Sequence, residues 1–290
     1  MGGFKKHMEV FPLIYSRSHY MDYSQSFYVC PEIFNEPGVI ENVRKYIVDS
    51  ISYANMLDDM RRVIVSENGY TSAGIVIDLK RYVSSLPTQD DYSKYVCDAK
   101  GRNIVAFLGV SFFSESLKRG DAIENFDEVI FNVFKDYIVN SDRWFSKDNN
   151  HYISTGVNVR TGQYHEKLFG NKVVCCGKSI YECSHEADKS LFYAVMSRCG
   201  DVNHGYLFCS NYYGIEAINH SPFRIITSKH VKKILRFNEE IDSEQSKAGT
   251  ELFKGIKEKI VSQKKKIVRV IIILSILIVI TFVILLIKIY

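Results

Sequence analysis

The sequence lacks the short motifs that mark the commonest nucleotide-binding and hydrolytic sites. It contains no Walker phosphate loop, no Gly-x-Gly-x-x-Gly, no His-Glu-x-x-His and no Gly-x-Ser-x-Gly. A large excess of one charge sign is also lacking, because the chain has 37 basic and 33 acidic residues. The composition therefore calls for no nucleic-acid partner. Proline occurs only five times, while 46% of the residues are apolar, which is enough to bury a core.

Cysteine pairs with metal-ligand spacing are lacking as well, since none of the seven cysteines forms a Cys-x-x-Cys pair. No apolar run near the N-terminus resembles a secretory signal, so we expect free thiols in a reducing compartment. Two alternatives stay open for residues 175–209. The histidines and cysteines could bind zinc, or Cys183 and His204 could form a nucleophile pair. Most of these cysteines lie in apolar runs, which favours packing in the core. We therefore expect that the protein binds no metal and no cofactor and is not an enzyme.

A long uncharged run does occur, at residues 270–287. Eighteen residues of helix span about 27 Å, close to the thickness of the hydrocarbon core. Arg269 and Lys288 flank the run, and Lys264–Lys266 precede it, as expected on a cytosolic side. We therefore expect a single-pass tail anchor at residues 267–288 in the mitochondrial outer membrane or the endoplasmic reticulum, in contact with lipid, with the N-terminal part cytosolic.

A basic amphipathic helix or stalk is expected just before the anchor, at residues 238–266. Its apolar stripe is formed by Leu252, Phe253, Ile256 and Ile260. Such a helix can lie on anionic lipid.

Helical spacing also dominates residues 37–155. Ile40, Val43, Ile47 and Ile51 share one helical face, and residues 126–137 repeat the pattern. Tyr53 to Ile64 continues the first rhythm up to a break at Asn68-Gly69. Residues 103–113 are apolar nearly all round, which is typical of a buried strand or a central buried helix. The length of this run and its charged exit favour the helix.

Two motifs in this region resemble the Bcl (B-cell lymphoma) family of apoptosis regulators. Gly101-Arg102 followed by Ile104-Val-Ala-Phe107 is similar to the first homology motif, and residues 144–152 are similar to the second. Arg102 precedes Trp144 by 42 residues, a separation that fits the family. The sequence departs from the family at Ala99-Lys100, where Asn-Trp is usual, and at Arg61-Arg62, where a death segment has Gly-Asp.

The resemblance implies a mainly α fold, with a Bcl-like helical bundle around a central buried helix. It implies a death-suppressing protein that binds the amphipathic death segments of pro-apoptotic partners in a hydrophobic groove. Arg102 would pair with an acidic residue of the partner, and Gly101 would allow close approach. The implied groove residues are Val105, Ala106, Phe107, Leu57, Met60, Leu79 and Val83, while Trp144 and Tyr152 would pack the second motif.

The remaining residues divide into an N-terminal extension at 1–36 and a small cysteine-containing α+β module at 156–237. Short strands are predicted at 172–176, 179–183 and 205–209, with a strand or helix at 191–198. Two other functions stay open. One is a tail-anchored protein of membrane trafficking or fusion, and the other is a membrane-bound enzyme whose chemistry lies in residues 156–237.

Overall fold

The computed structural model describes residues 6–23, 28–35, 39–51, 60–87, 90–148, 151–165, 172–175, 177–201, 204–212, 221–229 and 231. The chain divides into two units, Met1–Lys233 and Ile234–Tyr290, and every described residue belongs to the first. None of the helices in this part of the chain is long and apolar enough to cross a bilayer. The predicted stalk and the predicted anchor lie outside the described residues.

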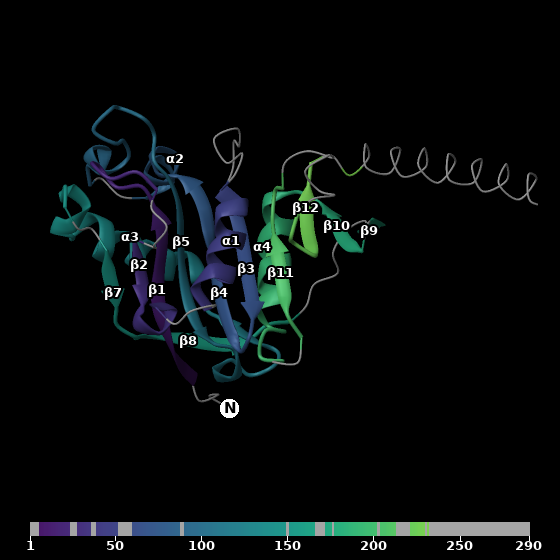
Figure 1. Ribbon diagram of the computed structural model, residues 1–290. Coiled ribbons are helices and arrows are strands. Elements are labelled where there is room, and N and C mark those ends of the chain that lie inside the picture. Colours follow the sequence, from purple (N-terminus) through teal and green to yellow (C-terminus); the bar gives the residue numbers. More distant parts are fainter. Residues whose placement is uncertain are drawn as a thin grey trace, which may run out of the picture. The chain divides into compact units, whose positions relative to one another are not determined.

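A mixed sheet dominates the first unit (Figure 1). Its strands are β1 (Lys6–Ser16), β2 (Val29–Pro31), β3 (Arg61–Glu67), β4 (Tyr70–Asp78), β5 (Val105–Phe113), β6 (Asp121–Ile123), β7 (Tyr152–Ser154), β8 (Val157–Gln163), β9 (Lys172–Cys175), β10 (Lys178–Glu182), β11 (Tyr206–Cys209) and β12 (Ile225–Ser228). The strand order is β6-β8-β1-β5-β4-β3-β11-β12-β10-β9, and β2 joins β1 to β7 at the side.

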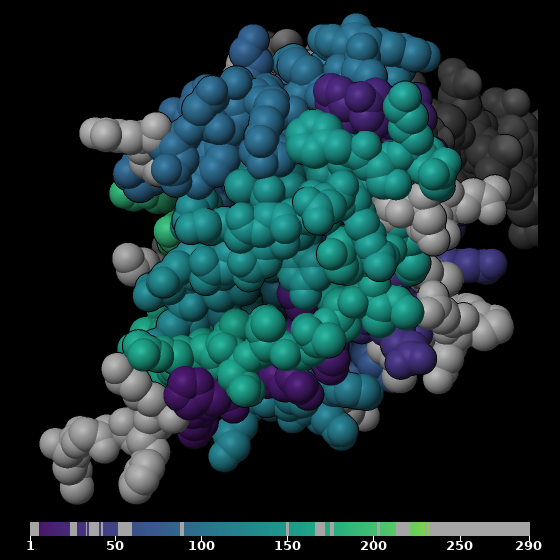
Figure 2. Space-filling view, turned by 90° about the vertical axis from the view of Figure 1, so that its left-hand side faces the viewer, coloured from purple at the N-terminus to yellow at the C-terminus, as the bar shows by residue number. Residues whose placement is uncertain are grey.

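Helices cover both faces of the sheet. The helical elements are α1 (Val39–Ile51), α2 (Leu79–Ser85), α3 (Phe126–Phe134), α4 (His185–Met196), the 3₁₀ turns η1 (Glu32–Asn35), η3 (Ser93–Tyr95), η4 (Ser114–Ser116) and η6 (Asp142–Phe145), and the π turn η5 (Lys135–Val139). Ile75 and Leu108 pack with α3 and α4 in one core. The opposite face carries α1, and Arg61 of β3 donates to the carbonyl oxygen of Ser50 in that helix. A flank of this unit is covered by the teal segment that runs from β6 to β8 (Figure 2).

The predicted mainly α bundle is wrong, because the protein is built on this sheet. The expected central helix at residues 103–113 is strand β5, which pairs with β1 on one side and β4 on the other. Helices lie on both faces of β5, so nearly all of its side chains are buried. A strand buried on both faces shows no alternation in its sequence, and its apolar run therefore looks like a buried helix.

Asn68-Gly69 is a hairpin turn and not the end of a helix. The two residues have φ angles of 53° and 82°, and they join β3 to β4. Positive φ at both positions matches the twist of a two-residue hairpin, and asparagine followed by glycine tolerates it best. Ile64, assigned to a helical face from the sequence, lies in β3. Residues 52–59, including Leu57, lie outside the described part.

Two glycines, one in β4 and one in β5, leave room for the aromatic ring of Phe107 against the sheet. A Cβ atom added to Gly74 would lie 2.6 Å from the ring of Phe107, and one added to Gly109 would lie 2.7 Å from it. Each would also come within 2.5 Å of a carbonyl oxygen of the paired strand. Phe107 is fully buried over this pair, so the sheet requires glycine at both positions.

Several predicted elements are confirmed. The helical face at residues 40–51 is α1, and the amphipathic pattern at 126–137 is α3 with η5. The predicted strands at 172–176, 179–183 and 205–209 correspond to β9, β10 and β11, and the ambiguous stretch at 191–198 belongs mainly to α4. The predicted domain boundary at 155 and 156 falls inside the first unit, where β8 pairs with β1 and β11 pairs with β3.

Candidate functional site

Three parallel strands end on one side of the molecule and place polar residues there. β10 and β11 each run parallel to β12, which lies between them, and α4 connects β10 to β11. The residues just after these strands are Cys183 and Ser184, Ser210, and Lys229. Carboxyl ends of parallel strands are the usual place for ligands in open α/β sheets. The carboxyl edge of these three strands is therefore a candidate ligand site.

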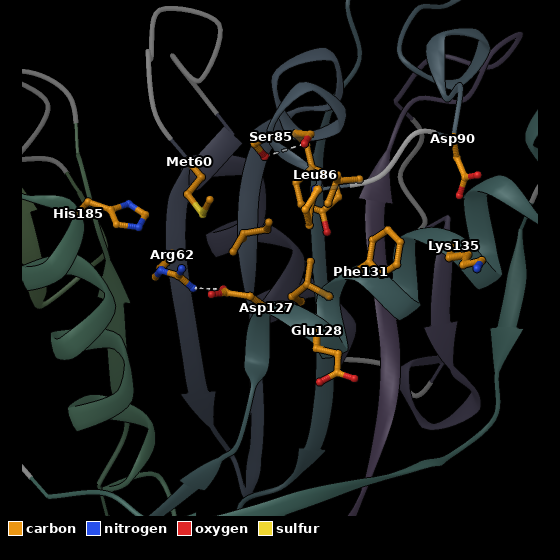
Figure 3. Close-up of a pocket in the computed structure, with 14 residues that line it drawn as sticks. Met60, Arg62, Ser85, Leu86, Asp90, Asp127, Glu128, Phe131, Lys135 and His185 are labelled. Carbon is orange, nitrogen blue, oxygen red and sulfur yellow. Dashed lines mark hydrogen bonds and ion pairs between the residues drawn. The ribbon is translucent and has the colours of Figure 1, made fainter.

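A cleft of about 680 Å³ lies beside these strand ends, between α2, α3 and the start of α4 (Figure 3). Its volume falls in the range of about 300–1,000 Å³ that is typical of small-molecule sites. The apolar lining consists of Met60, Ile75, Tyr82, Leu86, Pro87, Ile130 and Phe131. The polar lining consists of Arg62, Ser85, Asp90, Asp127, Glu128, Lys135 and His185. We call this space the cleft.

Arg62 forms the charged floor of the cleft. Its side chain is 2% exposed, and Nη1 lies 2.9 Å from Oδ1 of Asp127, as the dashed line in Figure 3 marks. The guanidinium also lies over the ring of Phe192, 5.6 Å from its centre. Lys189 donates to the second carboxylate oxygen of Asp127 at 2.7 Å. Partial burial raises the pKa of Asp127, but Arg62 and Lys189 outweigh burial, and the net pKa lies below its usual value.

A second, smaller space of about 210 Å³ adjoins the cleft, and we call it the basic recess. It shares Met60, Arg62, Ser85 and His185 with the cleft. Its other lining residues are Ile77, Arg81, Cys183, Ser184, Asp188, Ser210 and Lys229. The residues after all three parallel strands thus meet in this one recess.

The half-buried Cys183 and the buried Asp188 form a polar pair on the wall of the recess. The thiol of Cys183 donates to Oδ2 of Asp188 at 3.2 Å. Burial, strengthened by the neighbouring carboxylate, raises the pKa of Cys183 to about 12. Burial also raises the pKa of Asp188, although Thr227, Cys183 and Arg62 oppose that shift. A thiol with so high a pKa is protonated at neutral pH, which is the opposite of an activated nucleophile.

The predicted partner-binding pair Gly101 and Arg102 lies in a tight turn, and neither residue lines the cleft. Asp98 accepts hydrogen bonds from the backbone N–H groups of Lys100 and Arg102, each at 2.9 Å, and from Nε of Arg102 at 2.6 Å. Arg102 also donates to Asp22 at 3.2 Å. Gly101 has a φ of 76°, which the turn requires. The observed role of both residues is to shape this turn.

The implied groove floor lies inside the protein. Val105, Ala106 and Phe107 belong to β5 and are at most 1% exposed. Leu79, the first residue of α2, is fully buried, and Val83 of the same helix is half-buried. Met60 is the residue of this predicted set that lines the cleft, among those with described side chains. The sheet therefore does not assemble the set into a groove.

Trp144 and Tyr152 both have packing surroundings. Trp144 is fully buried in η6, and the ring of Tyr28 meets it edge-on with centroids 5.3 Å apart. Tyr152 lies on β7, where the guanidinium of Arg143 sits 4.2 Å from the centre of its ring. The two residues pack against different neighbours, and neither lines the cleft or the basic recess.

Metal binding finds no support in the described part of the chain, where no three histidine, cysteine or acidic residues form a group that could hold an ion. Cys199 and Cys209 are fully buried, and burial raises the pKa of each thiol to about 12. Cys176 lies outside the described residues, as does the side chain of Cys175. The described cysteines of this region behave as apolar core residues or, in Cys183, as a hydrogen-bond donor.

Sequence reasoning missed Arg62, Arg81, Asp127 and Lys229 as site residues. One signal was available in the sequence, since Arg61-Arg62 opens an otherwise apolar run of Val, Ile and Val. The structure buries both arginine side chains. A second signal was Ser184-His185, which follows a predicted strand and caps α4, with Ser184 accepting from the backbone N–H of Ala187 at 3.1 Å. Comparisons with family models, with curated proteins and with solved structures found no match.

Proposed function

We propose that this protein is a membrane-attached receptor whose folded unit binds a small ligand with an apolar body in the cleft. One observation carries the proposal: the cleft combines an apolar wall with a buried, ion-paired arginine at its floor. A large apolar pocket with a few convergent polar groups is the usual form of a ligand site. Perturbed pKa values at Asp127 and Asp188 support the same place.

Membrane attachment rests on the uncharged run at residues 270–287. Removal of residues 267–290 should transfer the protein from the membrane fraction to the soluble fraction. Resistance of the intact chain to alkaline extraction would support a spanning anchor. Release of the intact chain by alkaline carbonate would contradict this part of the proposal and leave the cleft unaffected.

Binding is favoured over catalysis because the best candidate nucleophile near the cleft is deactivated. The pKa of Cys183 is about 12. His204, the base suggested for it, lies within 3.2 Å of Asp201 and is mostly exposed, and it lines neither the cleft nor the basic recess. The death-segment function stays a prediction from the sequence, but the helical bundle that it needs is replaced by the sheet.

The test uses 2-naphthol as a neutral aromatic probe and the full chain in detergent micelles. Isothermal titration calorimetry should give saturable binding beyond the heat measured with protein-free micelles. Ser85 lines the cleft and is exposed, so Ser85→Trp should fill the entrance and abolish binding. Ser84 is exposed on the same helix and does not line the cleft, so Ser84→Trp is the matched control.

Two results would overturn the proposal. One is the absence of saturable heat with the folded wild-type chain. The other is binding that survives Ser85→Trp, because the probe would then occupy the micelle or another surface.

A further inference from the structure

The charge of the basic recess differs from that of the cleft beside it. Arg62, Arg81 and Lys229 line the recess together with the carboxylate of Asp188, and the charge of Arg62 is offset by Asp127, so Arg81 and Lys229 supply the positive excess. The cleft, by contrast, has three carboxylates facing two cations. A ligand that spans both spaces therefore meets a positive potential at the recess end, so the recess favours an anionic group.

The backbone adds to this preference. α4 has twelve residues and begins at His185, directly after the turn that follows β10. Ser184 and His185 at its N-terminus both line the recess. The first N–H groups and the dipole of a helix favour an anion at this end. Lys229 and Ser210, which follow the two neighbouring parallel strands, complete the arrangement at the carboxyl edge of the sheet.

Buried polar atoms around the recess point to a ligand independently of the helix. Oδ1 of Asp188 and Nδ2 of Asn211 make no hydrogen bond to any described residue, and their side chains belong to residues that are 8% and 5% exposed. Buried polar groups normally have partners, so these atoms need an explanation.

A phosphoryl group supplies the missing chemistry. Its oxygens accept from arginine and lysine, and its second pKa near 6 leaves a hydroxyl on part of the population at neutral pH. That hydroxyl can donate to Oδ1 of Asp188. A volume of about 210 Å³ is ample for such a group with some water.

We infer that the basic recess binds the phosphoryl group of the same ligand whose apolar body occupies the cleft, so the ligand class is a phosphate monoester of an apolar or aromatic compound. This inference rests on the proposed function. Tyr82 and Phe131 line the cleft with aromatic rings that suit an aromatic body.

The experiment compares 2-naphthol with 2-naphthyl phosphate, which differ by the phosphoryl group alone, in calorimetric titrations of the full chain. The phosphate should bind at least about tenfold more tightly. Arg81→Gln and Lys229→Gln should each weaken 2-naphthyl phosphate about threefold to tenfold and leave 2-naphthol unchanged. Both side chains are exposed, so the variants should fold.

Lys80→Gln is the matched control, because Lys80 is exposed beside Arg81 and does not line the recess. Equal affinity for the two probes, or an equal loss in Lys80→Gln and Arg81→Gln, would overturn the inference while binding of 2-naphthol still supports the cleft. Binding of neither probe would defeat both proposals. Inorganic phosphate should compete only weakly, and an affinity equal to that of 2-naphthyl phosphate would contradict a single ligand spanning both spaces.

Discussion

The guanidinium of Arg62 lies 2.9 Å from the carboxylate of Asp127, and burial is shared very unequally between them, with 2% of the arginine side chain exposed against 49% of the aspartate. The arginine has lost its water, whereas the aspartate retains much of it. A buried cation depends on its partner far more than an exposed carboxylate does.

Asp127→Asn should therefore lower the free energy of unfolding by about 1–3 kcal/mol, because it leaves the charge of Arg62 buried without its counterion. Urea unfolding of the full chain can be followed by the fluorescence of Trp144, the single tryptophan. Asp136→Asn, which changes an exposed carboxylate after the same helix, should cost less than about 0.5 kcal/mol. Equal losses in the two variants would show that the pair contributes nothing specific.

Acid should weaken the fold through Asp98. Burial raises its pKa, but the backbone and guanidinium N–H groups of Arg102 and the backbone N–H of Lys100 outweigh burial and lower the pKa to about 2. A pKa below the ordinary value of 3.8 stabilises the fold above about pH 4, and that contribution disappears as the pH falls from 3.8 towards 2. Asp98→Asn should flatten this part of the stability curve. An unchanged slope between pH 4 and pH 2 would remove Asp98 from the explanation.

Gly109→Ala should disrupt the centre of the sheet. The added methyl would lie 2.5 Å from the carbonyl oxygen of Ala73 and 2.7 Å from the ring of Phe107, and both neighbours are buried. We expect a loss of about 3 kcal/mol or failure to fold. Gly69→Asn is the control, since Gly69 has open space around it and asparagine tolerates its positive φ. Comparable soluble yields and melting temperatures for the two variants would contradict the close packing at Gly109.

Cys183 should resist alkylation in the folded protein. At pH 7.5 a thiol with a pKa of about 12 is almost entirely protonated, so iodoacetamide should modify Cys183 far more slowly than in urea. Site-resolved mass spectrometry gives the rate for each cysteine separately. Fast modification of Cys183 in the native chain would reveal an activated thiolate and restore the enzyme alternative.

The sequence predicted those elements that have one apolar face and one polar face. Ile40, Val43 and Ile47 mark one face of α1, and Phe126, Ile130 and Val133 mark one face of α3. β5 has no such difference, because α1 lies over one face and α3 over the other, so residues 105–113 carried no period that distinguishes strand from helix. The fold class was wrong for this reason.

The site could not be predicted because its residues meet only through the topology. Arg62 and Asp127 are 65 positions apart, and the sheet order sets their distance. The ends of β10, β11 and β12 come together only because β12 enters between the other two strands. Short motifs that resemble a family directed attention to Arg102, whose partners turned out to be Asp98 and Asp22.

The pairing of β1 has a consequence for synthesis on the ribosome. Phe11 pairs with Ser111, and Met8 pairs with Val159, so β1 leaves the ribosome before partners that lie 100 and 151 positions later. At about 5–20 residues per second, the first interval lasts roughly 5–20 s. During that time Leu13 and Ile14, fully buried in the finished sheet, have no native neighbours from β5. The apolar residues of β1 are therefore open to non-native contacts until β5 has been synthesised.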